Sequence, residues 1–109
     1  MNGWNSNFIV TINYDNFISM PTVKFTYALN KFFSGLKDTP AKGDTLKDVL
    51  KEIENNYPGI GSYILDEQGS LRRHVNIFID GVLINDRTSL SDRFTENSEI
   101  YIIQALSGG

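Results

Sequence analysis

The sequence of 109 residues contains no cysteine and only one histidine, His74. Without a thiol the chain cannot form a disulfide, a thiolate metal site or a cysteine nucleophile, and it cannot carry sulfur as a persulfide. A single histidine also excludes a histidine-rich metal site. These two absences remove thiol chemistry and the commonest zinc centres from the functions to be considered, and we expect no bound metal.

The chain also lacks positive charge and long apolar runs. Its formal net charge is −3 and its pI is about 5.0, so the electrostatic footprint of a nucleic-acid-binding protein is missing. No apolar run approaches the length of about 18 residues that spans a membrane. The first residues carry no basic segment of the kind that begins a signal peptide. We therefore expect a cytoplasmic protein without nucleic-acid or membrane partners.

The segment from Thr45 to Pro58 gives the clearest helical pattern. Thr45 is a favourable N-cap, and Pro58 disfavours helical geometry in the residue before it, so the helix should end at Tyr57. The apolar residues recur at i, i+3, i+4, i+7 and i+11, which places them on one face of an amphipathic helix. These residues are Leu46, Val49, Leu50, Ile53 and Tyr57.

Residues 73–79 give the strongest strand pattern, with Val75, Ile77 and Ile79 on one face and Phe78 on the other. An Asp-Gly turn follows, and residues 82–84 form the return strand of a hairpin. Weaker patterns predict strands over 8–14, 23–27, 36–41 and 99–105, a helical turn over 28–33, an irregular connector over 61–69 and a polar loop over 85–97.

One helix cannot cover both faces of a sheet. The pattern therefore predicts an α+β fold in which a mixed sheet carries the helix on one face and leaves the other face partly wet. The apolar side of the helix should pack on Val75, Ile77 and Ile79. Phe78 then lies on the solvent-exposed face of the sheet. There it is either an exposed anchor for a partner or a residue covered by the N-terminal segment.

The chain ends in Gly108-Gly109 directly after a predicted strand. Glycine has no Cβ, so such an end can thread a narrow channel and adopt backbone angles that other residues avoid. The strand would aim the terminal carboxylate away from the body, toward another protein's active site. The alternative interpretation is an ordinary chain end without function.

Other candidate sites have simpler explanations. His74 follows Arg72 and Arg73, which suggests an anion site, but a solvated strand start explains these charges better. The carboxylates of the predicted helix alternate with lysines, as on a solvated face. No glycine spacing fits a phosphate-binding loop, and no nucleophile is paired with a base.

Several segments together resemble the ubiquitin-like sulfur carriers, which include the small subunit of molybdopterin synthase and the carriers of the thiamine and cysteine pathways. The resemblance implies a β-grasp domain over residues 22–106, followed by a flexible tail over 107–109. Residues 1–21 have no counterpart in the family; we expect this extension to add an edge strand, because residues 8–14 alternate. The resemblance depends on Gly43-Asp44-Thr45-Leu46, Asn56-Tyr57-Pro58-Gly59-Ile60, His74 to Gly81 and the diglycine end.

The resemblance also implies a mechanism. A partner adenylyltransferase of the ubiquitin-activating type uses ATP and magnesium to adenylate Gly109, sulfur is installed as a thiocarboxylate, and a second enzyme accepts it. Ser107 and Gly108 would thread the partner's channel, while Phe78 and Leu106 would dock. The protein is then a carrier and substrate, not an enzyme, either alone or as the small subunit of a complex such as molybdopterin synthase.

Two other functions remain open at this point. One is a protein modifier that is joined to lysine through Gly109, and the other is an interaction domain whose tail is idle. The residues before the diglycine differ from those of many family members, which carry proline and valine or alanine there. This difference leaves the identity of the sulfur acceptor open.

Overall fold

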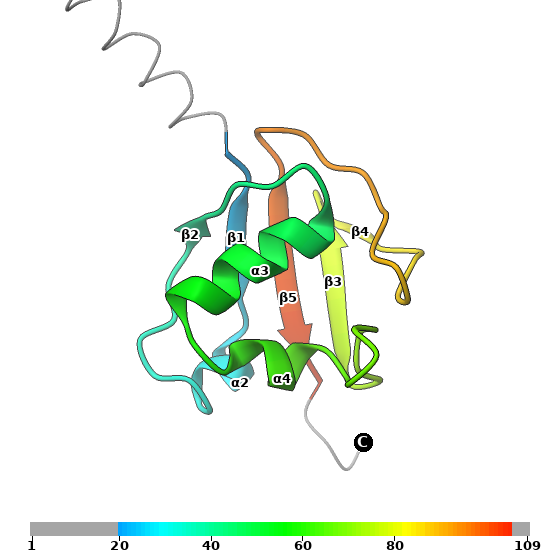
Figure 1. Cartoon of the computed structure of the whole chain (residues 1–109). Helices are drawn as coiled ribbons and strands as arrows, with labels where there is room; N and C mark the ends of the chain where they lie inside the picture. Colours follow the sequence, from blue (N-terminus) through cyan, green and yellow to red (C-terminus); the bar gives the residue numbers. More distant parts are fainter. Residues whose placement is uncertain (1–19, 106–109) are drawn as a thin grey trace, which may run out of the picture.

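The computed structural model describes residues 20–105, and the strand predicted over 8–14 lies outside this range (Figure 1). The helices and strands are β1 (Thr22–Phe25), α2 (Tyr27–Asn30), β2 (Thr39–Pro40), α3 (Leu46–Asn56), α4 (Ile60–Ile64), β3 (Val75–Ile79), β4 (Val82–Leu83) and β5 (Glu99–Gln104).

The strands form one mixed sheet in the order β2-β1-β5-β3-β4. β1 and β5 are parallel, whereas the other three neighbouring pairs are antiparallel. Figure 1 shows α3 crossing one face of this sheet, with α4 below it on the same side. The predicted α+β architecture, a mixed sheet with its main helix on one face, is confirmed.

Helix α3 begins after the predicted cap Thr45 and ends at Asn56, one residue short of the predicted end at Tyr57. The side-chain oxygen of Thr45 accepts a hydrogen bond from the amide of Asp48 (3.1 Å) and so caps the helix. Its inner face packs into a core shared with β1, β3 and β5. The predicted core residues Leu46, Val49, Leu50, Ile53, Val75, Ile77 and Ile79 are all buried.

The predicted irregular connector after α3 is partly wrong, because it contains the helix α4. The carboxylate of Glu54 accepts hydrogen bonds from the amides of Gly59 (2.9 Å) and Gly61 (2.7 Å), which satisfies donors at the start of this helix. Ile60 and Ile64, one turn apart, are buried. A pattern of two apolar residues is too short to identify a helix whose cap comes from another helix.

The prediction of a strand over 23–27 is wrong at its end. The strand stops at Phe25, and the side chain of Thr26 accepts the amide of Leu29 (3.4 Å), which starts α2. Tyr27 therefore does not share the inner face of the strand, and it is 77% exposed. A threonine between apolar residues fits either a strand or a helix cap, so alternation alone misplaced this boundary.

The two edge strands are very short. The strand predicted over 36–41 is reduced to Thr39–Pro40, whose proline has no amide to donate to a further strand. At the other edge, Asp80 and Gly81 both have positive φ (51° and 84°), as the predicted hairpin turn requires. The Asp80 carboxylate accepts the amide of Glu99 (2.9 Å), which joins this turn to the start of β5 and lowers the pKa of Asp80.

The position of Ile77 yields a stability prediction. Ile77 is fully buried in the central part of the sheet. Ile77→Ala should lower the free energy of unfolding by ~2–5 kcal/mol, through lost burial and the cavity left behind. Denaturant unfolding would measure this, with Val82→Ala as a control: Val82 is 68% exposed, so its truncation should change stability by less than about 0.5 kcal/mol. Equal effects of the two substitutions would contradict the assigned core.

The cap at α4 yields a pH prediction. The amides of Gly59 and Gly61 favour the ionised form of Glu54, so its pKa lies below the ordinary value of 4.5. A carboxyl group with a lowered folded pKa stabilises the fold above its unfolded pKa, and this contribution is lost as the pH falls through the folded value. Glu54→Gln should therefore lower the melting temperature at neutral pH, and the difference from the unaltered chain should shrink below pH 4.5.

The control for this experiment is Glu52→Gln, which removes the same charge from the same helix. It should leave the melting temperature almost unchanged at every pH. A difference between Glu54→Gln and the unaltered chain that stays constant with pH would show that the charge of Glu54 does not stabilise α4.

Candidate functional site

The last strand occupies the centre of the sheet. β5 pairs with β1 on one side and with β3 on the other, and its register with β3 runs from Ile79↔Ile100 to Val75↔Gln104. Ile100 and Ile102 are buried beneath α3. The chain beyond Gln104 is therefore attached to the most firmly held strand of the protein.

Two neighbouring elements hold the end of β5. The amide of Ala105 donates a hydrogen bond to the carbonyl oxygen of His74 (2.8 Å), and the amide of Gln104 donates to the side-chain oxygen of Thr26 (3.4 Å). Thr26 is fixed in turn, because its own amide donates to the carbonyl oxygen of Ile102 (3.2 Å). The end of β5 is thus held by hydrogen bonds as far as Ala105, the last described residue.

A further clamp at this end comes from Arg87, in the segment that the sequence predicts as a polar loop. Its guanidinium donates to the side-chain oxygen of Asn76 (2.9 Å) and to the carbonyl oxygen of Val75 (2.9 Å). These bonds hold the start of β3, the strand that carries His74 at its entry. An arginine in a polar loop looks like an ordinary surface residue in sequence, so this contribution was missed.

Gln104 carries an unusual side-chain atom. Its Oε1 is buried, and no hydrogen-bond donor within residues 20–105 reaches it. Most buried polar atoms have a partner, since leaving one unpaired costs about 1–3 kcal/mol. The alternation of β5 places Gln104 on the apolar face of the sheet. It does not show that the side-chain oxygen lacks a hydrogen-bond donor there.

The predicted reacting residues lie just beyond the described part of the chain. Leu106, Ser107, Gly108 and Gly109 follow Ala105, the last described residue. A fully extended chain advances at most ~3.6 Å per residue, so Gly109 lies within about 14 Å of Ala105. Any active site that receives its carboxylate must therefore approach the end of the body from which β5 leaves.

Phe78 lies on the face of the sheet opposite α3, as the alternation predicts. It is partly buried rather than fully exposed, because it pairs directly with Leu83 on one side and Tyr101 on the other. Those two neighbours are exposed. We call Phe78, Leu83 and Tyr101 the sheet-face patch; it is an apolar region of the solvent-exposed face of the sheet.

The basic residues before β3 are explained by structure. The side chain of Arg72 donates to the carbonyl oxygen of Ser62 (2.8 Å), which ties this segment to α4, and Arg73 and His74 are exposed.

Within residues 20–105, no group of three histidine, cysteine or acidic side chains is arranged to hold a metal ion. No helix in the same part of the chain is long and apolar enough to cross a membrane.

Comparisons with known proteins agree with this geometry. The sequence model of the ThiS family matches residues 24–109. The sulfur carrier protein CysO of Mycobacterium tuberculosis is 31% identical over 94 residues, which cover 84% of this chain and 96% of CysO.

Solved structures give the same result. The crystal structure of Mycobacterium tuberculosis CysO is 28% identical, has a TM-score of 0.63 and covers 78% of this chain and 98% of that one. The solution structure of small archaeal modifier protein 1 from Methanosarcina acetivorans is 26% identical, has a TM-score of 0.67 and covers 83% of this chain and 98% of that one.

Proposed function

This chain belongs to the ThiS family of small sulfur carrier proteins, which are not enzymes, and from that premise we propose that the carboxylate of Gly109 is the group that carries the sulfur. The chain has no cysteine, so the sulfur has no side chain to occupy and must be bound to the C-terminal carbonyl carbon. The observation that supports this most directly is the hydrogen-bonded end of β5, which anchors Ala105 immediately before the last four residues.

The chemistry requires a partner, because a carboxylate is a poor electrophile until it has a leaving group. In the proposed reaction an oxygen of Gly109 attacks the α-phosphate of ATP, and pyrophosphate leaves. A sulfide nucleophile then adds to the carbonyl carbon, and AMP departs with its bonding electron pair and one former carboxylate oxygen. The product is a thiocarboxylate. ATP and its magnesium ion belong to the site of the activating enzyme, a ubiquitin-activating-type adenylyltransferase.

The glycines suit a tail that is delivered into such a site. Reacting atoms must come within ~3–3.5 Å of each other, which requires the partner to enclose the end of the tail closely. Gly108 and Gly109 have no side chain to obstruct a narrow channel, and Ser107 adds only a small one. Leu106, at the base of the tail, would contact the mouth of the channel.

Similarity to CysO favours an acceptor in cysteine synthesis over one in molybdopterin synthesis. In the favoured route the thiocarboxylate sulfur attacks an activated amino-acid carbon in the second enzyme, and the leaving group on that carbon departs. Water then hydrolyses the resulting thioester, which restores the free carboxylate of Gly109 and leaves the sulfur on the amino acid. Assays of the sulfur-loaded protein with candidate acceptors of each pathway would distinguish the two.

Protein modification is the second candidate function. It is favoured by the likeness to the archaeal modifier protein, which matches this chain at 26% identity. In that reaction the ε-amine of a lysine, instead of sulfide, attacks the adenylated Gly109 and forms an isopeptide bond. Intact-mass spectrometry separates the two outcomes, because sulfur exchange replaces one oxygen atom whereas conjugation adds a whole protein.

Deletion of Gly109 tests the proposed function. It should abolish ATP-dependent adenylation and sulfur loading with almost no change in melting temperature, because every residue of the core described within 20–105 is retained. Gly108→Val should also cripple loading, since a β-branched side chain restricts the backbone and obstructs the channel. The measurement is intact mass after incubation with the adenylyltransferase, ATP and a sulfur source. Sulfur uptake by the deletion variant would refute the proposal.

The sheet-face patch yields a separate prediction. Phe78→Ala should weaken binding to the activating enzyme, because aromatic residues often anchor interfaces. Isothermal titration calorimetry would measure the Kd, and a thermal melt would verify that the variant is folded. Val82→Ala is the control, since Val82 is exposed at the same hairpin but lies outside the patch. A folded Phe78→Ala variant with unchanged affinity would remove Phe78 from the interface.

A further inference from the structure

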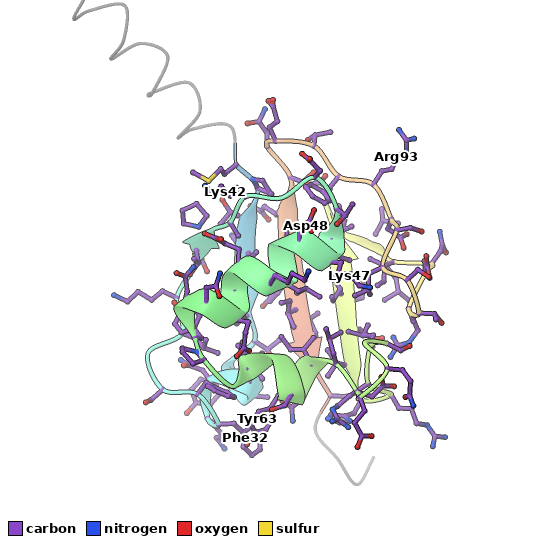
Figure 2. All side chains as sticks on the ribbon, in the orientation of Figure 1. Phe32, Lys42, Lys47, Asp48, Tyr63 and Arg93 are labelled. Carbon is purple, nitrogen blue, oxygen red and sulfur yellow. The ribbon has the colours of Figure 1, made fainter. Side chains whose placement is uncertain are left out.

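A second group of aromatic residues lies at the end of the molecule where β5 ends, far from the sheet-face patch in sequence. Phe33 and Tyr63 meet edge to face with ring centroids 4.9 Å apart, and Phe32 lies beside Tyr63 at 5.4 Å. Figure 2 shows Phe32 and Tyr63 together at this end, below α4. The group joins the segment after α2 to α4.

Only part of this group serves the fold. Phe33 packs against the core, and its ring lies 3.7 Å from the position that a Cβ on Gly59 would occupy. Tyr27 and Phe32, by contrast, are 77% and 54% exposed. Large apolar side chains that gather on a surface mark interaction sites, whereas single ones do not. We call Phe32 and Tyr63, together with Tyr27 at the start of α2 five residues before Phe32, the aromatic patch.

The aromatic patch is next to the base of the tail. Tyr27 directly follows Thr26, whose side-chain oxygen accepts the amide of Gln104 (3.4 Å) and whose own amide binds the carbonyl oxygen of Ile102 (3.2 Å). The backbone at Tyr27 is thus within a few ångströms of the last residues of β5. The sheet-face patch lies on the opposite side of the sheet from α3.

We propose that the aromatic patch docks against an apolar rim around the mouth of the channel through which the activating enzyme takes the tail. This inference rests on the proposed function. Only four residues separate Ala105 from the end of the chain, and they span at most ~14 Å. An enzyme that aligns Gly109 with the α-phosphate of ATP must therefore bring its channel mouth against this end of the body.

The side chains of the aromatic patch determine what kind of partner surface would fit against it. Phe32 and the faces of Tyr27 and Tyr63 require an apolar surface with a shallow recess for the rings. The Nζ atom of Lys31 lies 5.8 Å from the centroid of the Tyr27 ring, which adds a positive charge at the border of the patch. A complementary rim would place a carboxylate opposite Lys31.

The test uses the double variant Tyr27→Ala/Phe32→Ala in the full chain. ATP–pyrophosphate exchange, catalysed by the adenylyltransferase that activates the unaltered chain, gives KM and kcat for the carrier. The double variant should raise KM about tenfold, which is typical for loss of interface anchors, and should leave kcat unchanged because the tail is intact. Val82→Ala, an exposed apolar residue at the other end of the molecule, should leave both constants unchanged.

A competition experiment separates docking from the chemistry of the tail. The chain without Gly109 should still inhibit exchange by the unaltered chain, because it keeps the aromatic patch. Adding Tyr27→Ala/Phe32→Ala to that deletion should weaken the inhibition about tenfold. Melting temperatures within error of the unaltered chain would exclude misfolding, because both side chains are exposed; Phe33→Ala, which touches the core, should lower the melting temperature.

The outcomes distinguish the two proposals. Absence of exchange with the unaltered chain would overturn the proposed function, and the docking inference with it. Exchange with the unaltered chain, combined with an unchanged KM for the double variant, would overturn the docking inference alone. A change of oligomeric state in the double variant, measured by sedimentation, would assign the patch to contacts between copies and would also overturn it.

Discussion

The pairing of β5 with two neighbours at once is the interaction on which the rest of the structure depends. β5 pairs in parallel with β1 and antiparallel with β3, so this last described strand joins the two halves of the sheet. The same strand contributes Ile100 and Ile102 to the core beneath α3. Loss of β5 from the sheet would separate the two halves of the fold and release the base of the tail together.

A tail only a few residues long constrains how a partner can bind. The end of the body has to meet the partner, so its surface contributes to recognition whatever the tail does inside the channel. The described chain carries the aromatic patch at this end of the body, and the sheet-face patch further away on the solvent-exposed face of the sheet. A carrier must also leave each enzyme after its reaction, which favours a few separate anchors over one large apolar interface.

The main features of the fold were predictable because they depend on periodic patterns. The alternation of Val75, Ile77 and Ile79 and the helical spacing after Thr45 both follow from burial on one face, and burial is visible in sequence. Helix α4 was not predictable, because its cap comes from Glu54 on the preceding helix. Thr26 and Arg87 hold the end of the sheet through hydrogen bonds to segments distant in sequence, so a local pattern gives no sign of these roles. Gly108 and Gly109 were singled out by their place after the last predicted strand; they lie outside the described residues, so their role stays a prediction.

The parallel pairing of β1 and β5 has a practical consequence for handling the protein. Parallel strands begin at the same end of a sheet, and Thr22 accordingly pairs with Glu99 while Phe25 pairs with Ile102. Anything fused ahead of β1 is attached at the end remote from the exit of β5, as Figure 1 shows. Affinity handles, fluorophores and surface tethers therefore belong on the β1 side of the domain, where they leave the carboxyl end open to an enzyme.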